Sequence, residues 1–117
     1  MAEPPQKFKV GLIQMSCGAD PKRNLKTAVA RVRQAARRGA KIVCLPELFR
    51  TQYFCQREDA ALFDLAEPIP GPTTNALAEV ARKEKVVVIA SVFEKRAAGV
   101  YHNTAAVLDA TGSLAGL

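Results

Sequence analysis

Glu47 is the side chain of this 117-residue sequence that is best placed for chemistry. It directly follows Pro46 and a short apolar run, residues 42–45. Such a run, rich in β-branched residues, predicts a strand buried on both faces, and Pro46 ends it. Because open α/β sheets place their chemistry at the carboxyl ends of strands, this position predicts a general base. The alternative is a strand-end carboxylate paired with a nearby arginine.

Aromatic and aliphatic residues surround Glu47 in the sequence. Leu48 and Phe49 follow it directly, and Tyr53 and Phe54 come a few residues later. Apolar surroundings would raise the pKa of Glu47 toward that of a working base. We predict that Tyr53 and Phe54 line a substrate pocket; packing in the core is the alternative for both.

The three cysteines, Cys17, Cys44 and Cys55, form no CxxC pair, and their odd number is typical of free thiols in a reducing cytoplasm. Cys44 lies within the predicted strand and is expected to pack in the core. Cys55 lies in the loop near the predicted pocket. With His102 as the single histidine, a zinc site of the usual spacing is not available. Asn103 is expected to satisfy backbone or turn groups.

The net charge of +6 raises the question of nucleic-acid binding. Much of this charge alternates with an apolar helical stripe between residues 31 and 41, which is typical of a solvated helix face. We therefore expect no nucleic-acid partner. No apolar run approaches the roughly 20 residues of a membrane span, so no membrane association is expected. Residues 1–7 lack a hydrophobic signal region and are predicted to be a flexible tail, consistent with a cytoplasmic location.

Hydrophobic periodicity predicts an α/β protein that begins with a strand–helix–strand unit. After the helix at 73–85, a strand and its hairpin partner follow, and a last strand begins near the end of the chain. Because the chain stops within that strand, we expect residues 8–117 to be the N-terminal portion of a longer domain. The predicted strands are 8–15 (largely buried), 41–45, 86–93, 100–108 and 113–117, and the predicted helices are 21–38, a short one within 56–66, and 73–85 capped by Thr73 or Thr74.

Several motifs together resemble the nitrilase superfamily of carbon–nitrogen hydrolases. The resemblance follows the chain in order over nearly its whole length. Within the superfamily, residues 14–17, 47–56 and 65–68 are most similar to N-carbamoylputrescine amidohydrolases. The motifs are Val-Gly-Leu-Ile-Gln-Met at 10–15, Asn24-Leu25, Leu-Pro-Glu-Leu-Phe at 45–49, Gly-Pro-Thr-Thr at 71–74, and the stretch from Tyr101 to Gly112.

The resemblance implies an α-β-β-α sandwich with a mixed sheet and a Glu–Lys–Cys catalytic set. Glu47 matches the general base, whereas the lysine and the nucleophilic cysteine of the family would lie beyond Leu117. None of the three cysteines present matches the family's nucleophile. The resemblance implies no metal or organic cofactor, a small ureido or amide substrate, and a homo-oligomer.

Three functions remain open from the sequence. The parent protein is expected to hydrolyse N-carbamoylputrescine to putrescine, carbon dioxide and ammonia, or to act on another ureido or amide compound such as a β-ureido acid. The chain by itself is expected to be an inactive fragment. A small binding module with a flavodoxin-like sheet is the weakest alternative, because Cys17-Gly18-Ala19-Asp20 offers one glycine where a phosphate loop needs several.

Overall fold

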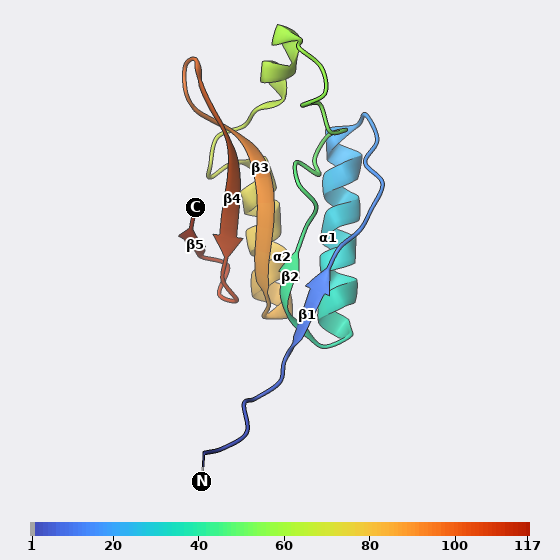
Figure 1. Cartoon of the computed structure of the whole chain (residues 1–117), viewed down its shortest axis with the longest axis vertical. Helices are drawn as coiled ribbons and strands as arrows, with labels where there is room; N and C mark the ends of the chain where they lie inside the picture. The colour runs from blue at the N-terminus through green and yellow to red at the C-terminus, as the bar shows by residue number, and fades with distance from the viewer. Residues whose placement is uncertain (1) are drawn as a thin grey trace.

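A single five-stranded sheet forms the centre of the computed structural model, which describes residues 2–117. The strands lie in the order β1-β2-β3-β4-β5 (Figure 1). The first three are parallel to one another, and β4 and β5 each run antiparallel to the preceding strand. This mixed sheet confirms the predicted α/β class. The strands are β1 (Lys9–Leu12), β2 (Ala40–Cys44), β3 (Val87–Ala97), β4 (Val100–Leu108) and β5 (Leu114–Gly116).

Helix α1 (Pro21–Arg37) begins and ends at the residues that local chemistry predicts. The Asp20 carboxylate accepts hydrogen bonds from the backbone N–H groups of Lys22 (3.0 Å) and Arg23 (3.4 Å), and Pro21 occupies the first helical position. At the other end, Gly39 has a φ of +95°, a conformation that glycine adopts at little cost. The chain therefore leaves α1 and enters β2 within a few residues.

Helix α2 (Pro72–Glu84) begins one to two residues before the predicted cap. Gly71 is the N-cap residue, and the Thr74 hydroxyl accepts a hydrogen bond from the Gly71 N–H at 2.9 Å. A Cβ at position 71 would lie 2.2 Å from the Pro68 carbonyl oxygen, so glycine alone fits there. Thr73 and Thr74 were the predicted caps, but both are buried inside the first turn.

The hydrophobic core lies on one face of the sheet, beneath both helices. Val43 on β2 and Val88 on β3 are fully buried there, against Val32 of α1 and Leu77 of α2. The opposite face carries alternate residues that are only half-buried, such as Ile42 and Cys44. The prediction that the second strand is buried on both faces is therefore wrong within the described residues, and Cys44 lies outside the core cluster.

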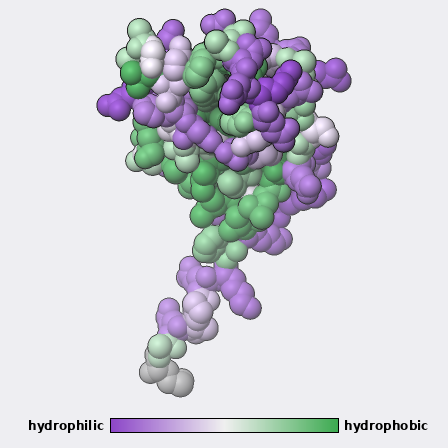
Figure 2. All heavy atoms as spheres, turned by 45° about the horizontal axis from the view of Figure 1, so that its top comes forward, coloured by the Kyte–Doolittle hydropathy of each residue, from purple (hydrophilic) through white to green (hydrophobic). Residues whose placement is uncertain are grey.

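Strand β1 is an edge strand, which overturns the prediction of a largely buried first strand. It pairs with β2 alone, and its side chains Val10 and Leu12 are 53% and 79% exposed. Figure 2 shows hydrophobic atoms at the surface just above the extended N-terminal segment. Residues 2–7 are exposed and belong to no helix or strand.

Strand β3 is longer than predicted, and this length matters for the site. It continues through the polar residues Glu94, Lys95 and Arg96 and turns into β4 as a hairpin, as expected. A 3₁₀ helix, η1 (Ala60–Leu65), confirms the predicted short helix. In residues 2–117, the longest helices fall short of the length and apolarity that crossing a membrane requires.

We expect Leu77→Ala to lower the free energy of unfolding by about 2–5 kcal/mol, because it leaves a cavity between α2 and the sheet. Asn75→Ala, on the exposed side of the same helix, should change it by about 0.5 kcal/mol or less. Urea denaturation followed by circular dichroism measures both. Equal losses for the two variants would contradict the placement of Leu77 in the core.

Candidate active site

The candidate site begins where the chain leaves β2. Leu45 still pairs with β3, its N–H donating to the Ile89 carbonyl at 3.0 Å, and Pro46 then interrupts the ladder. Leu48 has a φ of +49°, which is rare for a residue with a side chain and costs roughly 1–3 kcal/mol. This turn buries the Leu48 side chain and leaves the Glu47 carboxylate exposed. Glu47 is thus at a strand end, as predicted, but not in apolar surroundings.

A chain of hydrogen bonds holds the Glu47 turn against the β3–β4 hairpin. The Leu48 N–H donates to the Ser91 hydroxyl oxygen at 2.9 Å, and that hydroxyl donates to Asn103 Oδ1 at 3.0 Å. Asn103 Nδ2 in turn donates to Glu47 Oε1 at 2.7 Å. The expectation that Asn103 serves backbone or turn groups is therefore wrong, because its side chain joins Ser91 to Glu47.

Two further residues fix the loop that follows Glu47. The buried Asn24 side chain donates to the carbonyl oxygens of Gly18 (2.8 Å) and Arg50 (2.9 Å), so it joins the β1–α1 loop to the Glu47 loop. The Arg50 guanidinium forms an ion pair with Glu67 and donates to the Thr73 hydroxyl at 2.8 Å. Arg50 therefore pairs with Glu67, and the alternative of an arginine partner for Glu47 has no support in residues 2–117.

Tyr53, one of the two predicted substrate contacts, lies close enough to Glu47 for the carboxylate charge to affect its pKa. Its side chain is 49% exposed and lies beside the Cys55 thiol. Hydrogen bonding with Cys55, the negative charge of the Cys55 thiolate and, after these, the Glu47 carboxylate raise the pKa of Tyr53. A phenol, a thiol and a carboxylate thus meet in one exposed area.

Phe54, the other predicted substrate contact, faces a different neighbour. Its ring packs on Phe93 of β3 with centroids 4.8 Å apart, and Phe63 and Tyr101 extend this aromatic cluster. Phe54, Phe63 and Phe93 line a groove of about 500 Å³ that also contains Cys55 and the acidic residues Glu58 and Asp59. Phe93 lies opposite Asn103 in the β3–β4 register, so the groove adjoins the Glu47 network.

The three thiols differ in their surroundings. Burial raises the pKa of the Cys17 thiol, which disfavours the nucleophilic thiolate. Cys44 is half-buried on β2, and Cys55 is exposed beside Tyr53. Within residues 2–117, no three His, Cys, Asp or Glu side chains converge in a way that could hold a metal ion. The arrangement is suited to acid–base chemistry by Glu47.

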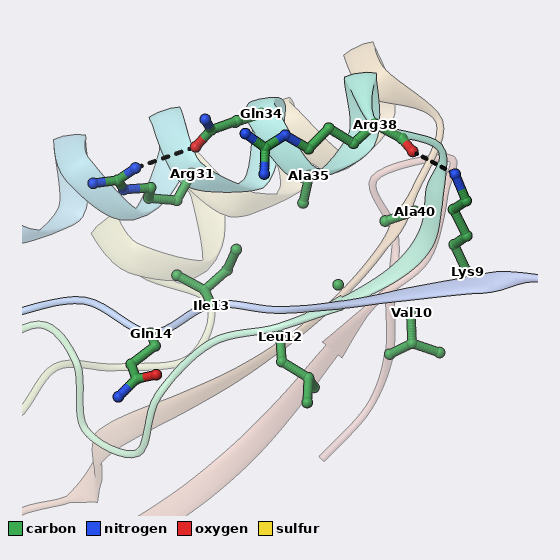
Figure 3. Close-up of a pocket in the computed structure, with 11 residues that line it drawn as sticks. Lys9, Val10, Leu12, Ile13, Gln14, Arg31, Gln34, Ala35, Arg38 and Ala40 are labelled. Carbon is green, nitrogen blue, oxygen red and sulfur yellow. Dashed lines mark hydrogen bonds between the residues drawn. The ribbon is translucent and has the colours of Figure 1, made fainter.

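A second hollow lies between β1 and α1, and it lacks groups for catalysis. Figure 3 shows Lys9, Arg31, Gln34 and Arg38 around this groove of about 450 Å³. Lys9 Nζ donates to the Arg38 carbonyl oxygen at 3.2 Å, and Arg31 donates to Gln34. Neither a carboxylate nor a thiol lines it, so the area around Glu47 is the better candidate.

Comparison with known proteins relates this chain to carbon–nitrogen hydrolases. The family model described as carbon–nitrogen hydrolase matches residues 9–117. The N-carbamoylputrescine amidase of Solanum lycopersicum is 37% identical over 118 residues, covering 100% of this chain and 39% of that protein. An omega-amidase of Mus musculus is 38% identical, covering 92% of this chain and 37% of that protein. The chain therefore spans less than two-fifths of the length of these relatives.

A solved structure supports the same relationship. The crystal structure of a carbon–nitrogen hydrolase from Helicobacter pylori G27 superimposes with a TM-score of 0.85 at 37% sequence identity. The match covers 92% of this chain and 37% of that one. The predicted fold relationship is therefore confirmed.

The grouping of Tyr53, Cys55 and Glu47 has a spectroscopic consequence. In a Tyr101→Phe background, Tyr53 should ionise above the ordinary phenol value of about 10, because both neighbours disfavour a phenolate. Cys55→Ala should lower the midpoint most and Glu47→Gln less, as measured by the ultraviolet absorbance of the phenolate. Cys17→Ala is the control and should change nothing. An unchanged midpoint in Cys55→Ala would contradict the contact.

Proposed function

Because this chain belongs to the carbon–nitrogen hydrolase family, we propose that it carries the general base, Glu47, of an enzyme that hydrolyses a small ureido or amide compound. The main support for this proposal is the exposed Glu47 carboxylate at the carboxyl end of β2, with one oxygen held by Asn103. Tyr53 and Phe54 are proposed to contact the substrate, since Tyr53 lies near Glu47 and Phe54 lines the adjoining groove.

The proposed reaction proceeds through a covalent enzyme intermediate. Glu47 accepts the proton of a cysteine thiol, and the thiolate attacks the ureido or amide carbon. A lysine stabilises the oxyanion, and the proton that Glu47 holds leaves with ammonia. Glu47 then activates a water molecule that hydrolyses the thioester-type intermediate. For N-carbamoylputrescine, the released carbamate breaks down to carbon dioxide and putrescine.

N-carbamoylputrescine is the substrate that we propose first, supported by the likeness to the Solanum lycopersicum enzyme over the whole chain. The comparable identity to an omega-amidase favours a simple ω-amide as the second candidate. A β-ureido acid is a third. Formation of putrescine would place the reaction in polyamine synthesis. Self-association and a cytoplasmic location belong to the same proposal.

Glu47→Gln should lower the rate of ammonia release by about 10²–10⁴-fold, because glutamine cannot accept the thiol proton. The measurement compares N-carbamoylputrescine, an ω-amide and a β-ureido acid as substrates for the product of the complete reading frame that contains this chain. Asp64→Asn, which removes an exposed carboxylate of η1, is the matched control and should leave the rate unchanged. Normal ammonia release by Glu47→Gln would rule out the assigned role.

We propose that residues 8–117 are the N-terminal portion of a hydrolase domain and that the 117 residues alone are inactive. The partial burial of Cys17 and the position of Cys44 within β2 support this proposal. The purified chain should release no ammonia from any of the three substrates. Turnover that disappears in Cys55→Ala would overturn it.

A further inference from the structure

Asn103 is the side chain that contacts Glu47 directly, although it lies 56 positions away in the sequence. We propose that Asn103 is a positioning residue for Glu47 and that Ser91 sets the orientation of Asn103. This inference rests on the proposed function, in which Glu47 transfers protons. It assigns a role to two polar residues of the β3–β4 hairpin that take no direct part in the proposed reaction.

The direction of the hydrogen bonds follows from what each group can donate. An ionised carboxylate only accepts, so Asn103 must turn its NH₂ group toward Glu47. Its carbonyl oxygen then faces Ser91, whose hydroxyl donates to it. The Ser91 oxygen is free to accept from the Leu48 N–H, and it does so at 2.9 Å. Every donor has an acceptor, which leaves one orientation of the Asn103 amide favoured.

The contact makes the two oxygens of Glu47 different. Oε1 accepts the bond from Asn103 at 2.7 Å, whereas no hydrogen bond from residues 2–117 reaches Oε2. Oε2 is therefore the oxygen available to take a proton from a thiol or from water. With Oε1 held, the carboxylate cannot rotate freely, and Oε2 keeps one direction relative to the sheet.

The sheet explains why these side chains meet. Ser91 lies opposite Ala105 and Phe93 lies opposite Asn103, so Ser91 and Asn103 are diagonal neighbours on one face. Ser91 also follows the β3 residues that pair with β2, which places it beside the turn at Leu48. The network thus ties the base to two strands, and the same hydrogen bond to Ser91 supports the positive φ of Leu48.

The first test replaces Asn103 by leucine, which has a similar size and no donor. Because Glu47 Oε1 then lacks its partner, the carboxylate can rotate and Oε2 is no longer held in one direction. The value of kcat should fall about tenfold, with a smaller change in KM. Asn103→Asp, which places a second carboxylate beside Glu47 and offers it no N–H donor, should lower kcat at least as much.

Ser91 provides the second variant and the rescue. Ser91→Ala removes the group that orients the amide, so it should lower kcat by a smaller factor, again with little change in KM. Ser91→Thr keeps the hydroxyl and should restore the wild-type kcat. Thr104→Val is the matched control, because Thr104 is the next residue on β4, faces the helices and donates to the buried Glu94 at 2.7 Å. It should lower stability without changing kcat or KM.

A measurement without turnover separates this inference from the proposed function. The chemical shift of the Glu47 carboxyl carbon, measured by NMR in labelled protein at neutral pH, should change in Asn103→Leu and stay as in the wild type in Thr104→Val. If Glu47→Gln kept full activity, the proposed function would fall, and the NMR shift would still decide the contact. An unchanged chemical shift and an unchanged kcat in Asn103→Leu would overturn the positioning role.

Discussion

The candidate site depends on the unequal lengths of two neighbouring strands. Pro46 stops β2 after five residues, whereas β3 continues for eleven and folds back as β4. The part of the hairpin beyond β2 therefore has no strand beside it on that side. The Glu47 turn occupies this space, and Ser91 and Asn103 are the polar side chains that meet it. A longer β2 would pair with β3 here and leave no room for the turn.

The strength of this arrangement comes from backbone and side-chain groups acting together. Leu48 is held in an unfavourable conformation because its N–H has a partner in Ser91 and its side chain is buried. Asn24 and Arg50 fix the following residues from the opposite side. Strain at such a position is maintained where several contacts over-determine the backbone, as is usual near functional groups.

Local chemistry made much of the fold predictable. Asp20, Pro21 and Gly39 mark the ends of α1 because caps act over three or four residues, and the short connection after β3 predicted the hairpin. The position of Glu47 at a strand end followed from Pro46. Which face of the sheet is covered could not be predicted in the same way, because the apolar residues of β1 and β2 do not reveal how many elements pack on each side.

The contact of Asn103 with Glu47 could not be predicted from the local sequence, for a related reason. That contact depends on the β3–β4 register and on the end of β2 together, and these join residues far apart in the chain. One signal was present: Ser91 is the polar residue in the otherwise apolar first half of β3, on the face that also carries Phe93, and Phe93 lies opposite Asn103. The displaced start of α2 has the same origin, because Gly71 is required by contact with Pro68 and not by helix propensity.

The aromatic cluster also determines how the protein can be observed. The sequence contains no tryptophan and two tyrosines, Tyr53 and Tyr101. Tyr101 packs among the rings of the groove, and Tyr53 lies beside Cys55 and Glu47. Tyrosine fluorescence and the tyrosine bands of near-ultraviolet circular dichroism therefore originate around the candidate site and not in the helix-covered core. These optical signals would report the state of the site even while the rest of the fold stays constant.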